Sequence, residues 1–264
     1  MFDVALIEAE LAGTIFAGKL HLSAVTDSTN IDALEAARSG APHGSVYVAD
    51  EQRAGRGRGD HAWHSTAGEG LYVSVLLRPH IPALRLPLLP LVAGLAAAEA
   101  VHAVTGLSGD LRWPNDLLIG SRKAGGILVE SKTELRTEGA AVAFAVVGIG
   151  INVHQCSFAA ELATSATSLD IELGRKVLRQ PLLVALLKSL ERETLGLLDP
   201  DANKSILRRV EEASTWMRDR RVEVHGPQAC MGVTAGLDEH GFLRVRAADR
   251  LVTVQTGGIR ALQD

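Results

Sequence analysis

The sequence predicts an α+β protein with a domain of mixed sheet and helices followed by a small β-barrel. Strand-like and helical segments share the first 217 residues without a regular βαβ repeat. From about Arg220 onward, short β-like runs alternate with turns, as in small barrels. The 264 residues, 47% of them hydrophobic and 22% charged, suffice for one large core or two smaller ones. We therefore expect one domain over residues 1–217 and a second over residues 218–264.

The helix expected over 27-DSTNIDALEAARSG-40 carries its own boundary signals. Thr29, with Asp32 three residues later, has the spacing of a capping box, and Gly40 is a common helix stop. The other elements of the first domain follow from alternation or helical spacing and from the prolines and glycines that end them. They are strands over 45–50 and 71–78, a buried helix over 88–104, a strand–turn–strand unit over 111–132, an apolar strand over 141–153 and a leucine-rich helix with Pro181 in its first turn.

Composition argues against several classes of protein. The balance of 27 basic against 31 acidic residues gives a net charge of −4, unlike a protein that coats a polyanion. Cys156 and Cys230 form no CxxC pair, which fits a reducing cytoplasm. The N-terminal segment lacks the pattern of a secretory signal, and the apolar stretch 86–98 contains two prolines and is shorter than the roughly 20 residues of a membrane span. We expect a soluble, cytoplasmic protein with neither DNA nor a membrane as partner.

The loop 52-QRAGRGRGDHAW-63 concentrates arginine and glycine between two expected strands. Glycine lets a backbone approach a phosphate closely, and guanidinium groups clamp phosphate or carboxylate oxygens. Trp63, which closes the loop, can stack on a base. The loop is therefore a small-anion or nucleotide site, a solvated loop or a nucleic-acid arm; its single occurrence inside the fold weakens the last interpretation.

A second cluster combines 112-RWPND-116 with Lys123. One interpretation is a turn around a buried Trp113, followed by a surface lysine. The other follows from the two glycines of 124-AGGILVE-130, because a lysine that enters a strand beside them can face a cleft. Its compact ammonium suits the charge on a phosphate that is being transferred.

Polar groups at two further positions allow either a structural or a ligand-binding role. The segment 28-STN-30 is a helix N-cap or a set of contacts to a polar ligand, and Asn152, after the glycines of 148-GIGIN-152, ends a strand or contacts a ligand. The chain has no GxxxxGK[ST], no GxGxxG that opens a helix after a strand and no HExxH. His61 and His64 are interpreted as solvated, so no metal ligands are assigned.

With DSTN, QRAGRGRG, RWPND, KAGGILVE and GIGIN in this order, the chain resembles the biotin protein ligases (biotin–[acetyl-CoA-carboxylase] ligases). The resemblance runs from about Ser23 to Asn152 and continues weakly through 166-ATSL-169 and the tail. It implies a mixed-sheet biotin- and ATP-binding catalytic domain, similar to class II aminoacyl-tRNA synthetases, followed by an SH3-like barrel.

The reaction that the resemblance implies has two steps. Biotin and ATP with Mg²⁺ give biotinyl-5′-AMP and pyrophosphate, and a lysine of a biotin carboxyl carrier protein domain then attacks the mixed anhydride. Biotin and ATP are substrates, and no tightly bound prosthetic group is expected. Because a carboxylate must attack a phosphate, cations are needed more than a protein nucleophile.

The resemblance also assigns roles by position. The residues with catalytic roles are Lys123, Arg56, Arg58 and Asp116, the last near the incoming lysine. Those with biotin-binding roles are Ser28, Thr29, Asn30, Gln52, Arg56, Gly57, Arg58, Lys123 and Gly125. Those with nucleotide-binding roles are Gly55, Arg56, Gly57, Arg58, Trp63, Asn115, Lys123 and Asn152.

The chain departs from the family pattern at two places. Arg112 replaces the lysine usual before WPND, and Gly59-Asp60 stands where relatives often have a basic residue and then glycine. The lead before the match is too short for a winged helix-turn-helix, so a monofunctional ligase is expected rather than a repressor. Family members can pair, so a homodimer is allowed. Competing hypotheses are a lipoate ligase, a nucleic-acid-binding protein and a catalytically silent biotin sensor.

Overall fold

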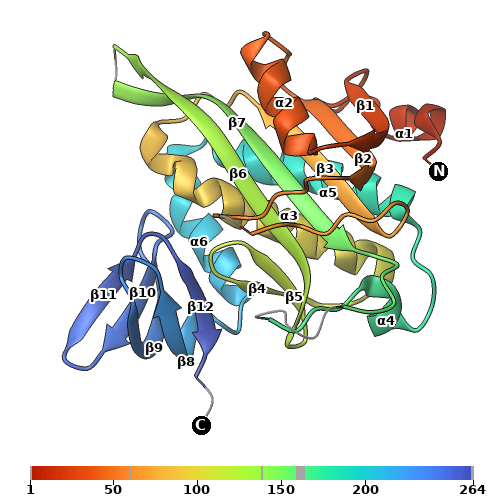
Figure 1. The fold of residues 1–264 in the computed structure, drawn as a ribbon. Helices are drawn as coiled ribbons and strands as arrows, with labels where there is room; N and C mark the ends of the chain where they lie inside the picture. The colour runs from red at the N-terminus through yellow and green to blue at the C-terminus, as the bar shows by residue number, and fades with distance from the viewer. Residues whose placement is uncertain (1, 60, 138, 159–163, 263–264) are drawn as a thin grey trace.

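Two sheets form the framework of the protein (Figure 1). The structure, a computed structural model, describes residues 2–59, 61–137, 139–158 and 164–262. A seven-stranded mixed sheet carries most of the helices, and a five-stranded antiparallel sheet follows at the C-terminal end. The predicted α+β class is therefore confirmed.

The seven-stranded sheet is mixed because β1 and β2 pair in parallel, whereas the remaining neighbours are antiparallel. Its order is β1 (Leu20–Thr26), β2 (Ser45–Gln52), β3 (Gly70–Leu77), β7 (Gly139–Asn152), β6 (Arg122–Arg136), β5 (Asp116–Ile119) and β4 (Gly109–Arg112). The sequence did not predict β1, because this edge strand is largely exposed and lacks a clear apolar alternation.

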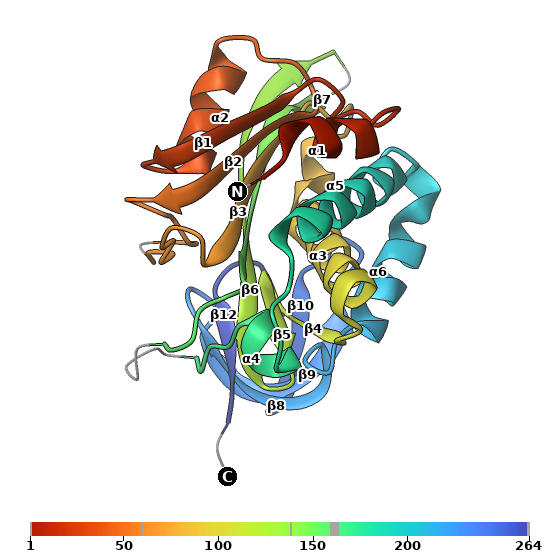
Figure 2. The ribbon, with the colours of Figure 1, turned by 90° about the vertical axis from the view of Figure 1, so that its right-hand side faces the viewer.

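Helices cover the two faces of this sheet unequally (Figure 2). The helical segments are α1 (Val4–Glu10), α2 (Thr29–Arg38), the 3₁₀ helix η1 (Ala83–Leu88), α3 (Leu89–Thr105), α4 (Leu169–Leu173), α5 (Arg179–Gly196), the 3₁₀ helix η2 (Pro200–Ala202) and α6 (Asn203–Glu212). A large apolar core lies between the sheet and α3 and α5. Beneath α2 on the opposite face lies a small cluster only, formed by Ala33, Ala37, Leu76, Phe144 and Val146.

The start of α2 corrects the predicted capping box. Ser28 is the N-cap residue, and its side chain makes no capping hydrogen bond within the described part of the chain. Tertiary partners take the two side chains instead. Thr29 Oγ1 lies 3.0 Å from Gln52 Oε1, and Asp32 Oδ1 accepts a hydrogen bond of 3.1 Å from Thr26 Oγ1. The predicted stop is confirmed, since Gly40 follows the helix with φ of +90°.

The segment predicted as strand–turn–strand over 111–132 contains parts of three strands. A turn after the cis Trp113–Pro114 peptide bond separates β4 from β5, and a tight turn at Gly120, with φ of +58°, separates β5 from β6. The sequence pattern was wrong here because strands of four residues are too short to show an alternation.

The apolar helical stretch is longer than the sequence suggested. Because η1 continues into α3, Ala83–Thr105 spans 23 residues and is long and apolar enough, by length and composition alone, to cross a membrane. In the fold, 61% of its most apolar window is buried, and α3 packs against α5 and the large sheet. The helix thus has the surroundings of a core helix.

The C-terminal sheet begins at Arg218. It comprises β8 (Arg218–His225), β9 (Cys230–Leu237), β10 (Leu243–Ala247), β11 (Arg250–Val254) and β12 (Gly258–Ala261), in the order β11-β10-β9-β8-β12. The sequence missed β12, whose four residues carry two exposed side chains. Trp113 Nε1 donates a hydrogen bond of 3.1 Å to Gly241 O in this region. The division of the chain into two domains at residue 217 stays a prediction.

Candidate functional site

Glycines open the backbone on the α2 face of the large sheet. Gly126 of β6 pairs with Gly150 of β7, and Gly148 points to the same face two residues earlier. A Cβ at Gly150 would lie 2.5 Å from the indole of Trp63, and one at Gly148 would lie 2.0 Å from Asn30 Oδ1. We call Gly126, Gly148 and Gly150 the glycine floor, because side chains from other elements lie directly on its backbone.

The loop between β2 and β3 brings Trp63 onto this floor. Its backbone is folded back on itself, with Trp63 N donating 2.8 Å to Gly55 O and Gly57 N donating 2.7 Å to His61 O. A Cβ at Gly55 would lie 2.3 Å from Trp63 O, so a glycine is needed there. Trp63 Nε1 is buried and has no hydrogen-bond partner among the described residues. The loop lies between two strands, as predicted; Asp60 lies outside the described residues.

A buried polar network surrounds the start of α2, where Ser28, Thr29 and Asn30 are all buried. Gln52 Oε1 accepts a hydrogen bond of 2.8 Å from Thr29 N. Thr29 Oγ1 lies 2.7 Å from Ser74 Oγ, which donates 2.6 Å to Asn30 Oδ1. Hydroxyl and amide groups are thus held in fixed positions beside the glycine floor.

Glu130 connects this network to the loop. Its Oε2 accepts hydrogen bonds of 3.0 Å from Asn30 Nδ2 and of 3.0 Å from Arg56 Nη1. Sequence reasoning missed both Glu130 and Ser74, because an isolated polar residue within a strand gives no motif. Arg56 is 42% exposed and forms the rim of the site.

A carboxylate between two cations lies at the other side of Trp63. Asp116 Oδ2 accepts from Arg112 Nε at 3.0 Å and from Arg112 Nη2 at 2.5 Å, and Asp116 Oδ1 lies 2.5 Å from Lys123 Nζ. Lys123 Nζ also lies 5.5 Å from the centre of the Trp63 ring, and its side chain is 27% exposed. These contacts favour the cleft-facing interpretation of Lys123 over a surface lysine.

Arg58 points from the loop to the C-terminal sheet, where its Nη2 donates to Gly257 O. Burial lowers the pKa of Arg58, and the negative charge of Asp116 opposes that change. The two loop arginines therefore have different surroundings. Arg56 contacts a carboxylate at the rim, whereas Arg58 contacts the backbone carbonyl of Gly257 in the turn between β11 and β12.

Three other predicted residues make contacts with the scaffold. Asn115 Nδ2 donates 2.8 Å to Ile127 O, and the buried Asn152 donates 3.0 Å to Thr167 O. A Cβ at Gly125 would point to Leu117, on the core side of the sheet, so Gly126 is the glycine whose Cα faces Trp63 and Lys123.

A further polar group lies buried beside Asn152. Gln155 Nε2 lies 3.4 Å from Asn152 Oδ1 and 3.5 Å from the Tyr72 hydroxyl, while Gln155 Oε1 finds no partner in the described part of the chain. Burial raises the pKa of Tyr72, so its hydroxyl stays a neutral donor, and it donates 3.1 Å to Thr66 O. Buried polar groups of this kind are usually paired, so Gln155 Oε1 is an acceptor available to a polar ligand.

No group of three His, Cys, Asp or Glu side chains suited to a metal ion occurs within residues 2–59, 61–137, 139–158 and 164–262.

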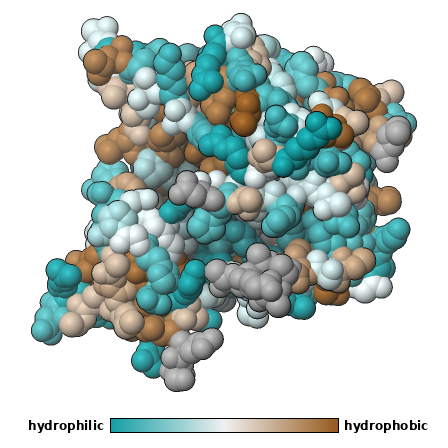
Figure 3. Space-filling model, in the orientation of Figure 1, coloured by the Kyte–Doolittle hydropathy of each residue, from teal (hydrophilic) through white to brown (hydrophobic). Residues whose placement is uncertain are grey.

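The face that carries the site is mostly hydrophilic across its centre (Figure 3). Arginine, lysine, amide and hydroxyl groups surround the glycine floor on this face.

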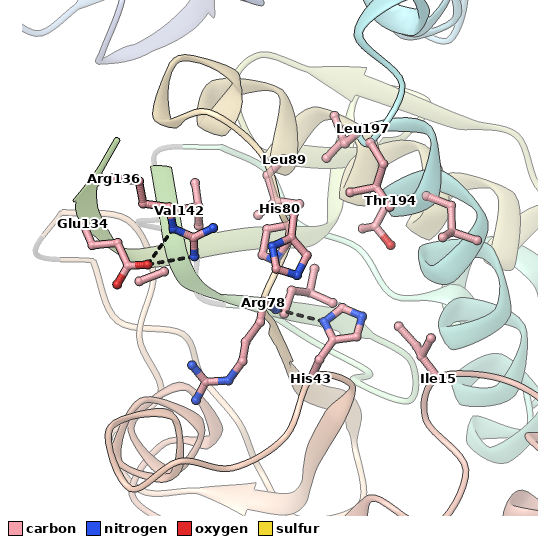
Figure 4. Close-up of a pocket in the computed structure, with 15 residues that line it drawn as sticks. Ile15, His43, Arg78, His80, Leu89, Glu134, Arg136, Val142, Thr194 and Leu197 are labelled. Atoms are coloured by element: carbon pink, nitrogen blue, oxygen red, sulfur yellow. Dashed lines mark hydrogen bonds and ion pairs between the residues drawn. The ribbon is translucent and has the colours of Figure 1, made fainter. Parts of the chain in front are cut away.

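A separate hollow of about 560 Å³ lies at the other end of β3 and β7 (Figure 4). The rings of His43 and His80 point into it, and Thr194 of α5 and Leu197, the residue after that helix, form one side. Its described lining residues include none of the predicted site residues. We place the functional site at the glycine floor, because the buried polar network, the Asp116–Lys123 pair and the unpaired Nε1 of Trp63 lie around it. The hollow also has cations, but Arg78 donates to two backbone carbonyls and Arg136 pairs with Glu134.

Known proteins share both the motif region and the fold. Residues 22–152 match the model of the biotin/lipoate A/B protein ligase family. Over 248 residues, 91% of this chain and 88% of the relative, the chain is 34% identical to the biotin–[acetyl-CoA-carboxylase] ligase of Mycobacterium tuberculosis. The chain belongs to the biotin protein ligase family.

Two further family members define the extent of the likeness. The bifunctional ligase/repressor BirA of Bacillus spizizenii is 42% identical over 170 residues, which are 64% of this chain and 51% of that protein. The biotin protein ligase of Aquifex aeolicus, solved in complex with biotin and ATP, has a TM-score of 0.76 and 28% identity and covers 94% of this chain and 100% of that one. The chain thus matches about half the length of the BirA relative and the whole of the Aquifex ligase structure.

Proposed function

We propose that the protein is an ATP-dependent biotin–[biotin carboxyl carrier protein] ligase (EC 6.3.4.15), which activates biotin as biotinyl-5′-AMP and transfers it to a carrier lysine. Membership of the family and the ligase names of its relatives support this reaction. The observation that carries the proposal is the glycine floor covered by Trp63, with the Asp116–Lys123 pair at its edge. It provides a backbone without side chains, an aromatic ring and a cation at one place.

The polar network at the start of α2 would hold the ureido ring of biotin. That ring presents one carbonyl acceptor and two N–H donors. Thr29, Asn30 and Gln52 offer hydroxyl and amide groups that both donate and accept, and the Ser28 side chain lies buried beside them. Because these groups bond to one another without ligand, biotin would exchange existing hydrogen bonds instead of leaving any group unpaired.

The nucleotide would take the glycine floor, with the Trp63 ring packed on the adenylate. The Trp63 ring lies on the floor itself, so the loop with Gly55, Gly57 and Arg58 would shift to admit the nucleotide. The unpaired Nε1 of Trp63 gives the ring a donor for such a ligand. Asn115 and Asn152 would act mainly by fixing the backbone beside the nucleotide.

The first step joins two anions. A biotin carboxylate oxygen attacks the α-phosphorus of ATP, a new O–P bond forms, and pyrophosphate leaves with the Mg²⁺ that arrives on ATP. Lys123, now paired with Asp116, would turn to the oxygens where charge gathers, together with Arg56. Arg112 would keep Asp116 neutralised when Lys123 moves, since it already holds the other carboxylate oxygen.

The second step transfers biotin to the carrier. The amine of the carrier lysine attacks the carbonyl carbon of the anhydride, the C–N bond forms, the C–O bond to phosphate breaks, and AMP leaves. Asp116, which pairs with Lys123, would accept or orient the ammonium proton of that lysine. We further propose a carrier domain of a biotin-dependent carboxylase as partner and a cytoplasmic location; a homodimer is compatible with this function.

Biotin-dependent exchange of labelled pyrophosphate into ATP tests the proposal. We expect exchange with biotin and none with lipoate at equal concentration. In a second assay, once excess ATP has been removed, biotin should be transferred from the adenylate to a purified carrier domain and stay attached to it. Lipoate is the matched alternative, because the family model covers both types of ligase. Exchange with lipoate alone, or with neither acid, contradicts the proposed function.

A further inference from the structure

We propose that Trp216 is a positioning residue for the Asp116–Lys123 pair and acts through Arg112. The inference rests on the proposed function for its catalytic consequence, but the contacts that carry it are independent of that function. Trp216 lies between α6 and β8, outside the motifs of the ligase family. It connects the segment before the C-terminal sheet with Arg112, Asp116 and Lys123 at the edge of the glycine floor.

Two guanidinium groups lie over the Trp216 ring. Arg112 Cζ is 5.2 Å and Arg220 Cζ 4.5 Å from the ring centre. Trp216 is 5% exposed and Arg112 is also buried, so the contact with Arg112 is largely shielded from water. Cation–π attraction is strongest in such desolvated surroundings, and the flat ring restricts how the guanidinium plane can turn.

The orientation of Arg112 determines which carboxylate oxygen of Asp116 is left to pair with Lys123. Arg112 Nε and Nη2 both bind Asp116 Oδ2, which leaves Oδ1 for Lys123 Nζ at 2.5 Å. Arg112 Nη2 also donates 3.0 Å to Thr164 Oγ1. The residue usual at this position in the family is lysine, which has one ammonium nitrogen. A lysine cannot donate from two nitrogens to one Asp116 oxygen and at the same time lay a flat group on the Trp216 ring. The arginine in this chain is therefore matched to Trp216.

Hydrogen bonds to β4 hold Trp216 beside Arg112 independently of the contact between its ring and the guanidinium. Residues 213–216 run beside β4, where Leu111 N donates 3.0 Å to Ala213 O. Ser214 Oγ donates 2.5 Å to Leu111 O and accepts 3.0 Å from Trp216 N. Removal of the indole should leave these anchors intact. The effect of such a change should therefore be local to Arg112 and the groups that it holds.

The first test compares Trp216→Leu, Trp216→Phe and Met217→Leu by pyrophosphate exchange. We expect Trp216→Leu to lower kcat about tenfold, with both KM values changed less than about twofold, because a misplaced charge affects the reacting state more than substrate binding. Phenylalanine keeps a smaller aromatic face and should restore most of the rate. Met217→Leu, a volume-conserving change at the buried neighbour, controls for packing and should leave kcat unchanged. Wild-type kcat in Trp216→Leu would overturn the proposal.

A double-mutant cycle then separates positioning from general destabilisation. Arg112→Lys alone should lower kcat, and its effect should be smaller in the Trp216→Leu background than in the wild type, because one of the two contacts that it changes, the stack on the ring, is already absent there while the contact with Asp116 is still lost. Independent, multiplicative effects of the two changes would contradict the proposed coupling. If Trp216→Leu does not fold, the cycle with Trp216→Met, which also lacks an aromatic face, gives the same comparison.

Chemical labelling gives a readout that needs no enzyme activity. In competitive acetylation with acetic anhydride and peptide mass spectrometry, we expect Trp216→Leu to raise the labelling rate of Lys123 several-fold relative to the exposed Lys132, because Lys123 loses its fixed partner. Failure of the wild type to exchange pyrophosphate would overturn the proposed function and leave this labelling result to decide the inference. Unchanged labelling of Lys123 would overturn the inference even where wild-type exchange is normal.

Discussion

The two faces of the seven-stranded sheet differ in what their residues are used for. On the α3 and α5 side, alternate positions of β3 and β7 carry buried aliphatic side chains, among them Val73, Val75, Val147 and Ile149. On the α2 side, the positions between them carry Ser74, Gly148 and Gly150 and only a small apolar cluster beneath the helix. One face buries apolar side chains that stabilise the fold, and the other lacks side-chain volume where Trp63 and Asn30 lie on its backbone.

Loss of the Lys123 ammonium should have the largest effect on the α2 face. Lys123→Ala should lower adenylate formation about 10²–10³-fold, the range for removal of a group that stabilises transition-state charge. Single-turnover formation of biotinyl-5′-AMP measures this. Lys132→Ala, an exposed lysine on the same strand, is the control. Wild-type turnover in Lys123→Ala would remove this residue from the mechanism.

Two substitutions on one strand compare the faces directly. Ile149→Ala should cost about 2–5 kcal/mol in the free energy of unfolding, because it leaves a cavity in the large core, while kcat stays near wild type. Gly148→Ala should instead raise KM for biotin about tenfold, since the added Cβ would lie 2.0 Å from Asn30 Oδ1 and displace that side chain. Urea unfolding and initial rates measure the two effects.

The control for a new methyl group is Gly196→Ala in α5, where a Cβ meets open space. It should leave both stability and KM nearly unchanged. The proposal that one face stabilises the fold and the other binds ligand would be refuted if Ile149→Ala impaired the reaction and Gly148→Ala only lowered the stability.

Arg58→Gly tests the contact between the loop and the C-terminal sheet, with a smaller effect. Without the bond to Gly257 O, the loop should retain the adenylate less well, so more biotinyl-5′-AMP should appear free in solution. Thin-layer separation of released intermediate measures the change. The loop is also expected to be mobile without ligand, and strong protection of its amides from hydrogen exchange would contradict that view.

The smallest effect concerns His43, in the hollow at the far end of the sheet. Burial, with contributions from Lys19, His80 and Arg78, lowers the pKa of His43. The unfolded chain therefore binds the proton more readily, and stability should fall as the pH is lowered from 6.5 through the folded-state pKa. His43→Asn keeps an acceptor for Arg78 N and should reduce this slope in melting temperature; an unchanged slope would assign it to another group.

The Gly-Arg loop shows what the sequence determined. Its motifs indicated the family and the position of the loop between two strands, because these depend on residue type and chain order. The strands with clear alternation and the long apolar helix were predicted for the same reason, whereas the exposed β1 and the short β12 gave no such signal.

Only the tertiary structure decided which groups meet. Trp63 lies on Gly126 and Gly150, Glu130 joins Asn30 to Arg56, and Trp216 reaches Arg112 from about a hundred residues along the chain. The predicted capping box failed for the same reason, since partners on β1 and β2 took its side chains. Side-chain chemistry is local to the sequence, but the distance between two side chains depends on strand pairing and packing. The sequence could therefore indicate the chemistry of this site but not the contacts that hold it in place.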